Sequence, residues 1–150
     1  MFGNFQLVKY AVVDAFKQLV QLVQQHYKSH RDGRRKTVYE ILHDADHLSV
    51  FWLTGKNESG NKSFQWDDAI RLTVFKRDLF AVDRICLEID LKNGEGIEVD
   101  EEMKGWDSLV QKLPEYLPGC KSFGEWFEVV AFPAFELNAT RIFERVAEKI

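Results

Sequence analysis

The chain has 150 residues, of which 45% are hydrophobic and 29% are charged, and its net charge is −4. This length and balance are typical of one globular domain, and they exclude a disordered, collagenous or low-complexity protein. The two cysteines, Cys86 and Cys120, form no CxxC motif. A secretory signal pattern is not visible either, so we expect two free thiols, no cofactor and a cytoplasmic location.

The charge is divided unevenly along the chain. Residues 1–36 carry seven Lys or Arg and two acids, a net charge of +5, whereas the remaining 114 residues carry −9. This division predicts a first element that is separate from an acidic body. Residues 4–28 are predicted to form an amphipathic helix, because apolar residues recur there every three or four positions: Phe5, Val8, Val12, Phe16, Leu19, Val23 and Tyr27.

The apolar face of that helix has three destinations that the sequence leaves open. The helix packs on the protein's own sheet, on a second copy of itself in a homodimer, or on a membrane surface. A membrane span is excluded because charges and amides interrupt the segment every few positions. A basic run at residues 31–36 follows the helix and is expected to be a solvated loop.

From residue 37 to residue 100 the hydrophobic period changes from 3.6 to 2, which predicts short strands. A polar loop is expected at residues 55–62 and a hairpin turn at Asn93-Gly94. Strands that follow one another in this way predict an antiparallel meander. The expected strands are 37–43, 48–53, 63–66, 69–77, 84–91 and 97–100.

Helical spacing resumes after the predicted strands. A helix is expected over residues 103–113, with the acids of residues 100–102 at its N-terminal end, where the helix dipole favours them, and Pro114 ending or kinking it. Ser122 and Glu125 match a capping box before a short helix over residues 123–130. A last amphipathic helix is expected near residues 139–149, with these side chains toward the body: Ile142, Phe143, Val146 and Ile150.

The order of these elements resembles the pleckstrin-homology-like superfold in its bacterial short form. The segments that carry the resemblance are 64–70, 82–91, the Asn93-Gly94 turn, 97–99 and 106–113. The resemblance covers residues 37–117 and implies an α+β fold, a bent antiparallel β meander of about six strands capped by a helix. The superfold hosts peptide and protein binding, so the resemblance implies a binding module.

Outside that region we expect an amphipathic helix and basic linker at residues 1–36. A short helical extension at residues 118–150 is expected to pack on the same domain. The segments 76–80, 101–106 and 131–135 are also similar to small uncharacterised bacterial proteins that have no assigned activity.

Two groups of polar residues are candidate sites. His43, Asp44, Asp46 and His47 place two imidazoles and two carboxylates within five residues, which are ligand types for a metal ion. The alternative is a polar hairpin turn whose Asp side chains bond to the local backbone. We favour the turn and assign no metal. These acids also stand where phosphoinositide-binding members of the superfold carry Lys and Arg, so we expect no membrane association.

The second group consists of candidate partner-binding residues: Asp100, Glu101, Glu102, Phe132 and Phe135. The first three form the densest acidic run, and the two Phe residues suit an exposed apolar patch. We therefore expect a non-catalytic protein-binding or adaptor module with a basic protein partner and no nucleic acid.

Two other functions stay open. One is a small-ligand-binding protein or small enzyme with a pocket between the sheet and the C-terminal helices. The other is an immunity-type inhibitor with an acidic binding surface. The sequence contains no GxSxG, HExxH or glycine-rich phosphate loop, so the expectation leans away from an enzyme.

Overall fold

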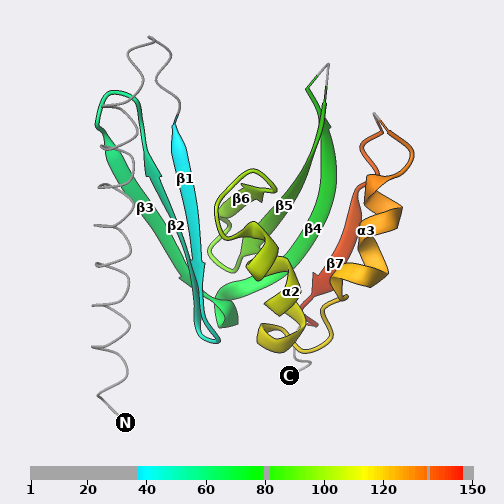
Figure 1. The fold of residues 1–150 in the computed structure, drawn as a ribbon. Coiled ribbons are helices and arrows are strands. Elements are labelled where there is room, and N and C mark those ends of the chain that lie inside the picture. The colour runs from blue at the N-terminus through cyan, green and yellow to red at the C-terminus, as the bar shows by residue number, and fades with distance from the viewer. Residues whose placement is uncertain (1–36, 80–81, 135, 147–150) are drawn as a thin grey trace.

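The computed structural model describes residues 37–79, 82–134 and 136–146 (Figure 1). The expected helix over residues 4–28, the basic run at 31–36, Phe135 and Ile150 lie outside these described residues. The described chain is an α+β fold with antiparallel sheets, as the sequence predicts. None of the described helices is long and apolar enough to cross a membrane.

The strands form two sheets. The first has the order β1-β2-β3, and the second has the order β6-β5-β4-β7. Neighbouring strands are antiparallel in both sheets. The strands are β1 (Val38–His43), β2 (His47–Leu53), β3 (Ser59–Gln65), β4 (Ala69–Asp78), β5 (Asp83–Leu91), β6 (Gly96–Asp100) and β7 (Thr140–Glu144).

The predicted order of six consecutive strands is confirmed, but a short 3₁₀ turn, η1 (Trp66–Asp68), lies between β3 and β4 and separates the two sheets. Trp66 is buried there, and its indole N–H donates to the carbonyl oxygen of Asp44 at 2.8 Å. Its backbone N–H donates to the carbonyl oxygen of Asp46 at 2.9 Å. These two bonds fasten the junction between the sheets to the β1–β2 turn.

Two sequence predictions were wrong about local structure. β3 begins at Ser59, inside the segment predicted as a loop, because a polar strand at the edge of a sheet has a loop-like composition. β7 replaces the helix predicted near 139–149, since pairing with β4 satisfies its backbone. Ile142 and Phe143 are buried as expected, whereas Val146 is exposed.

The helix α2 (Trp106–Tyr116) includes Pro114 and ends two residues after it. Gly105 precedes α2 with φ +96°, and a Cβ atom there would lie 2.3 Å from the carbonyl oxygen of Ile41. Only glycine therefore lets the start of α2 approach β1 this closely. The backbone N–H of Ile41 donates to the carbonyl oxygen of Lys104 at 2.7 Å, which joins the two elements.

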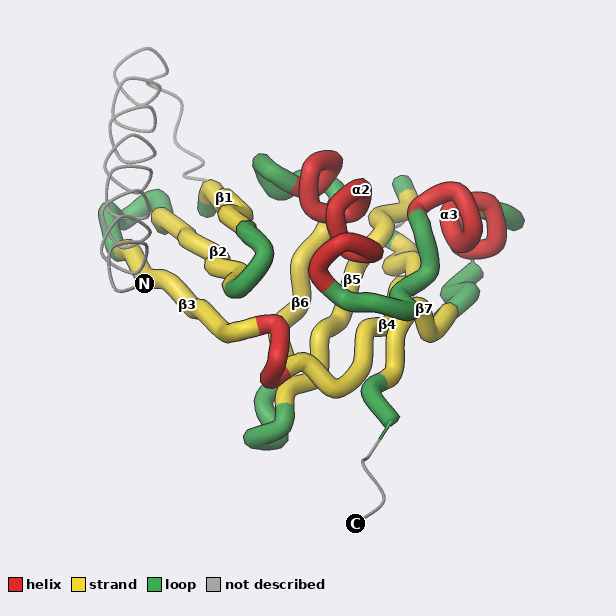
Figure 2. The backbone as a smooth tube through the Cα atoms, turned by 90° about the horizontal axis from the view of Figure 1, so that it is seen from below, coloured by secondary structure: helices red, strands yellow, loops and turns green. Residues whose placement is uncertain are grey.

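The second helix, α3 (Phe123–Ala131), begins with the predicted capping box of Ser122 and Glu125. In both views of the fold, α2 lies between the first sheet and α3 (Figure 2). One hydrophobic core unites both sheets and both helices. Its members include Leu48, Phe64, Leu72, Leu87, Leu109 and Trp126.

Both cysteines are free and buried, which confirms the prediction of two thiols. Burial raises the pKa of Cys86 to about 11 and that of Cys120 to about 12. Neither thiol is therefore a good nucleophile at neutral pH.

Candidate functional site

The β1–β2 turn brings three of the four candidate metal ligands together. Asp44, Asp46 and His47 offer ligand atoms that all lie within 4.8 Å of one another. The Asp44 Oδ1 atom accepts the backbone N–H groups of Asp46 at 2.8 Å and of His47 at 2.7 Å. The prediction that an Asp side chain bonds to the local backbone is thus confirmed, and this carboxylate closes the turn.

His43 does not join this group. Its Nδ1 atom lies 2.7 Å from the hydroxyl oxygen of Tyr116, near the end of α2. Burial lowers the pKa of His43, Asp44 opposes that shift and Lys112 adds to it. Tyr116 also stacks on Trp66, with ring centroids 5.5 Å apart. These contacts make His43 a structural link between the turn and α2.

The acidic run 100–102 is bonded to β5. Arg84 pairs with Asp100 at 3.7 Å and with Glu102 at 2.7 Å. The Glu101 carboxylate accepts the backbone N–H of Ile85 at 2.8 Å. The prediction that these acids lie at the N-terminal end of a helix over residues 103–113 was wrong, because Asp100 ends β6, α2 begins only at Trp106 and the acid in its first turn is Asp107. Part of the acidic charge is therefore compensated within the protein.

The end of α3 and the segment that joins it to β7 present apolar side chains to solvent. Phe132, predicted as a partner-binding residue, is 69% exposed, and Val129 and Leu137 are each more than half exposed. Among the described residues six large hydrophobic side chains are exposed, and three of the six lie within residues 129–137. We call Val129, Phe132 and Leu137 the apolar surface.

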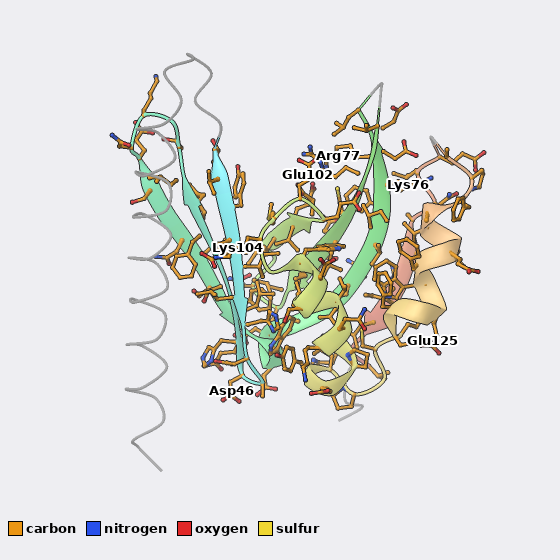
Figure 3. All side chains as sticks on the ribbon, viewed as in Figure 1. Asp46, Lys76, Arg77, Glu102, Lys104 and Glu125 are labelled. Carbon is orange, nitrogen blue, oxygen red and sulfur yellow. The ribbon has the colours of Figure 1, made fainter. Side chains whose placement is uncertain are left out.

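A buried lysine holds the backbone beneath the apolar surface. Lys76 on β4 is only 3% exposed. Its ammonium group donates to the carbonyl oxygens of Ala131 and Pro133 and lies 3.4 Å from the Asp83 carboxylate. Its backbone N–H donates to the carbonyl oxygen of Leu137 at 2.8 Å. Figure 3 shows Lys76 on β4, beside the segment that follows α3. These bonds fix the segment to the second sheet at two places, at residues 131–133 and at Leu137.

Asn138 makes the second set of bonds. Its side-chain nitrogen lies 3.2–3.4 Å from the carbonyl oxygens of Val130, Phe132 and Pro133. Its backbone has φ +45°, a conformation that Asn tolerates better than most residues. The backbone carbonyls of the segment therefore turn toward Lys76 and Asn138, and the apolar side chains are left outside.

The charged residues within the stretch 122–140 are all acidic, although Lys121 and Arg141 flank it directly. Residues 122–140 contain Glu125, Glu128 and Glu136 but no Lys or Arg, and all three carboxylates belong to exposed residues. An apolar centre with an acidic border is complementary to a partner that offers an apolar anchor flanked by cations.

The sequence interpretation missed Lys76, Val129, Leu137 and Asn138. One signal was available for Lys76, because it continues the inward-facing alternation of Leu72 and Val74 on β4. A lysine on the buried face of a strand indicates fixed hydrogen-bond acceptors nearby. Nothing in the local sequence indicated that the Asn138 side chain contacts carbonyl oxygens of residues 130–133.

Searches of protein-family models, of curated proteins and of solved structures found no match to this chain.

Proposed function

We propose that this protein is a non-catalytic protein-binding or adaptor module of the cytoplasm whose apolar surface holds a basic protein partner. The observation that carries the proposal is the exposure of Val129, Phe132 and Leu137 on a segment whose own polar groups are bonded inward. We infer that these three exposed side chains, all within residues 129–137, form one apolar patch, and such patches are typical of protein-binding sites.

The fixed backbone of this segment favours binding. A segment that is already held in one conformation loses less conformational entropy when a partner docks on it. Lys76 on β4 and Asn138, which lies just before β7, supply that restraint by donating to the carbonyl oxygens of Ala131 and Pro133. A large aromatic side chain such as Phe132 is also well suited to act as the anchor.

The acidic run 100–102 supports binding less well. Arg84 pairs with two of its three carboxylates, and a partner's cations would have to compete with that guanidinium. An immunity-type inhibitor would bind its target through this acidic run. We therefore propose it only as the second candidate function, after binding through the apolar surface.

We also propose that residues 37–117 are a variant of the pleckstrin-homology-like superfold. The support is the order of the elements, six consecutive antiparallel strands followed by α2. This superfold relation names no ligand, so the binding function is argued from the apolar surface alone.

A random-peptide phage library, selected on the immobilised full-length protein, tests the binding proposal. The selected peptides should be enriched in aromatic or aliphatic residues flanked by Lys and Arg. Phe132→Ser combined with Leu137→Ser should weaken the best peptide at least about tenfold, as expected for a central anchor. Val146→Ser, which changes another exposed valine, is the matched control and should leave affinity unchanged.

The proposal is wrong if the selected peptides are acidic or if the double substitution leaves their affinity unchanged. Circular dichroism on each variant would separate loss of the surface from loss of the fold.

A further inference from the structure

The strand β3 is an edge of the first sheet, because it comes last in the order β1-β2-β3. Two bonds that continue the β2–β3 register show how its backbone is used. The backbone N–H of Thr54 donates to the carbonyl oxygen of Glu58 at 2.8 Å, and that of Trp66 donates to Asp46 at 2.9 Å. Bonded and non-bonded pairs alternate along an antiparallel ladder. The even-numbered residues of β3 are therefore the ones that bond to β2.

The odd-numbered residues of β3 direct their backbone groups away from the sheet. They are Ser59, Asn61, Ser63 and Gln65, and all four are exposed. None of the described residues bonds to their backbone N–H or carbonyl groups. An unpaired row of this kind is a template for one more strand. The edge of β3 therefore fits a partner in an extended conformation.

The strand β3 lacks the features that usually prevent edge pairing. Native edges carry prolines, bulges or outward charges, but β3 contains no proline and pairs with β2 without a register shift. Its one charged side chain, Lys62, donates to the Gly96 carbonyl oxygen at 3.2 Å and lies 3.5 Å from the Glu95 carboxylate. That cation is directed toward the β5–β6 hairpin, and the odd-numbered side chains along the edge are neutral.

We propose that the edge of β3 pairs with the β3 edge of a second copy of this chain, antiparallel and about a two-fold axis. The strand is self-complementary, because serine hydroxyls and the amides of Asn and Gln both donate and accept hydrogen bonds. A basic partner would gain little from this neutral strand, whereas an identical strand matches its polar side chains. A two-fold contact also closes on itself, as in most homodimers.

The charge of Lys62 selects the register. A two-fold axis at Lys62 would place the two ammonium groups on directly opposite residues, and like charges in that position are unfavourable. An axis at Ser63 would place Lys62 opposite Phe64. An axis at Asn61 places it opposite Gly60, whose lack of a side chain leaves Lys62 room to keep its bonds to the β5–β6 hairpin. We therefore place the axis at Asn61, where about six backbone hydrogen bonds would form.

This contact is separate from the apolar surface. In Figures 1 and 2, β3 and α3 lie on opposite sides of the molecule. One added strand makes a small interface, so we expect a weak dimer that is half formed at about 0.1–1 mM.

Disulfide trapping in the full chain tests the register. Asn61→Cys places two thiols at the axis, where paired Cα atoms lie about 5.5 Å apart, a distance that a disulfide spans. Ser63→Cys is the matched control, because it is exposed on the same face but lies at least about 13 Å from its copy. Under mild oxidation, Asn61→Cys should form covalent dimers at least about tenfold faster than Ser63→Cys. Cys86 and Cys120 are buried and should not link.

Removing one N–H group from the edge tests the pairing itself. Asn61→Pro removes a donor that the protein's own sheet does not use, and edge strands accept proline at such positions. Asn61→Ala keeps the donor and is the matched control. Sedimentation up to about 1 mM should show dimers of Asn61→Ala, and dimers at least about tenfold weaker for Asn61→Pro. Circular dichroism would show that both variants are folded.

Three results would overturn the proposal. The first is a monomer at about 1 mM, the second is equal linking of Asn61→Cys and Ser63→Cys, and the third is equal dimerisation of folded Asn61→Pro and Asn61→Ala. None of these measurements uses a library peptide or changes the apolar surface. A failure here therefore leaves the proposed binding function to its own test.

Discussion

The acidic run 100–102 and the apolar surface form a contrast, although both include residues that the sequence marked as partner-binding. In the acidic run, the charged side chains are bonded back to Arg84 and Ile85 of β5. In the apolar surface, the backbone carbonyls are bonded inward to Lys76 and Asn138, and the large side chains remain in solvent.

Residue type alone therefore does not identify a binding surface in this protein. A partner can use only the groups that the fold does not already satisfy. Ion pairs with Arg84 compensate part of the charge at residues 100–102, whereas the side chain of Phe132 is 69% exposed to solvent.

Lys76→Met should cost the most stability. It removes a buried ammonium that neutralises Asp83 and binds two carbonyl oxygens, and breaking such a buried pair costs about 3–5 kcal/mol. Urea denaturation measures the change in the free energy of unfolding. Lys112→Met, at an exposed position on α2, should change it by less than about 0.5 kcal/mol. A loss below about 1 kcal/mol for Lys76→Met would show that this lysine does not hold the segment.

Asn138→Ala should cost about 1–3 kcal/mol, because it removes the amide bonds and places alanine at a positive φ. Asn138→Gly tolerates the same φ and removes only the amide. It should therefore cost less than Asn138→Ala in the same denaturation assay. Equal costs for the two variants would assign the whole effect to the amide, and no cost for either would remove Asn138 from the account.

Glu102→Gln should change the free energy of unfolding by less than about 1 kcal/mol, because the Glu102 side chain is 65% exposed and solvent screens its ion pair with Arg84. It should also leave peptide affinity unchanged. Isothermal titration with a library-selected peptide measures the affinity. A clear loss of affinity would move the binding site to the acidic run.

The smallest effect is expected at His43, outside both regions. Because its pKa is lowered in the folded protein, the unfolded chain binds more protons as pH falls below about 6.5. Stability should therefore decline through that pH and level off below the folded pKa. Denaturation midpoints measured at several pH values should show a shallower decline for His43→Gln. An unchanged slope would assign the pH dependence to other groups.

Much of the fold was predictable because its signals are local. Period-2 alternation located β4 and β5, and the Ser122–Glu125 capping box located α3. The failures depend on distant pairing. The helical spacing after Ala139 gave no sign that β4 would accept Thr140–Glu144 as a strand, and the break at Trp66 depends on carbonyls 20 or more residues away.

The candidate site was predictable only in part, for the same reason. Phe132 was identified with Phe135 as a possible exposed apolar patch in the segment 132–135, and the exposure of Phe132 agrees with that prediction. The bonds that hold it outward join residues 55 and 57 positions apart in the chain, and no local pattern encodes them.

A nuclear magnetic resonance titration would show whether a partner binds at the apolar surface or at the acidic run, because it reports on both regions at once. The uniformly ¹⁵N-labelled full-length protein would be titrated with the tightest peptide from the library. The account predicts that the largest amide shifts fall at Val129, Phe132 and Leu137, with little change at Arg84 and residues 100–102. Largest shifts at Arg84 and the acidic run, with residues 129–137 unchanged, would contradict it.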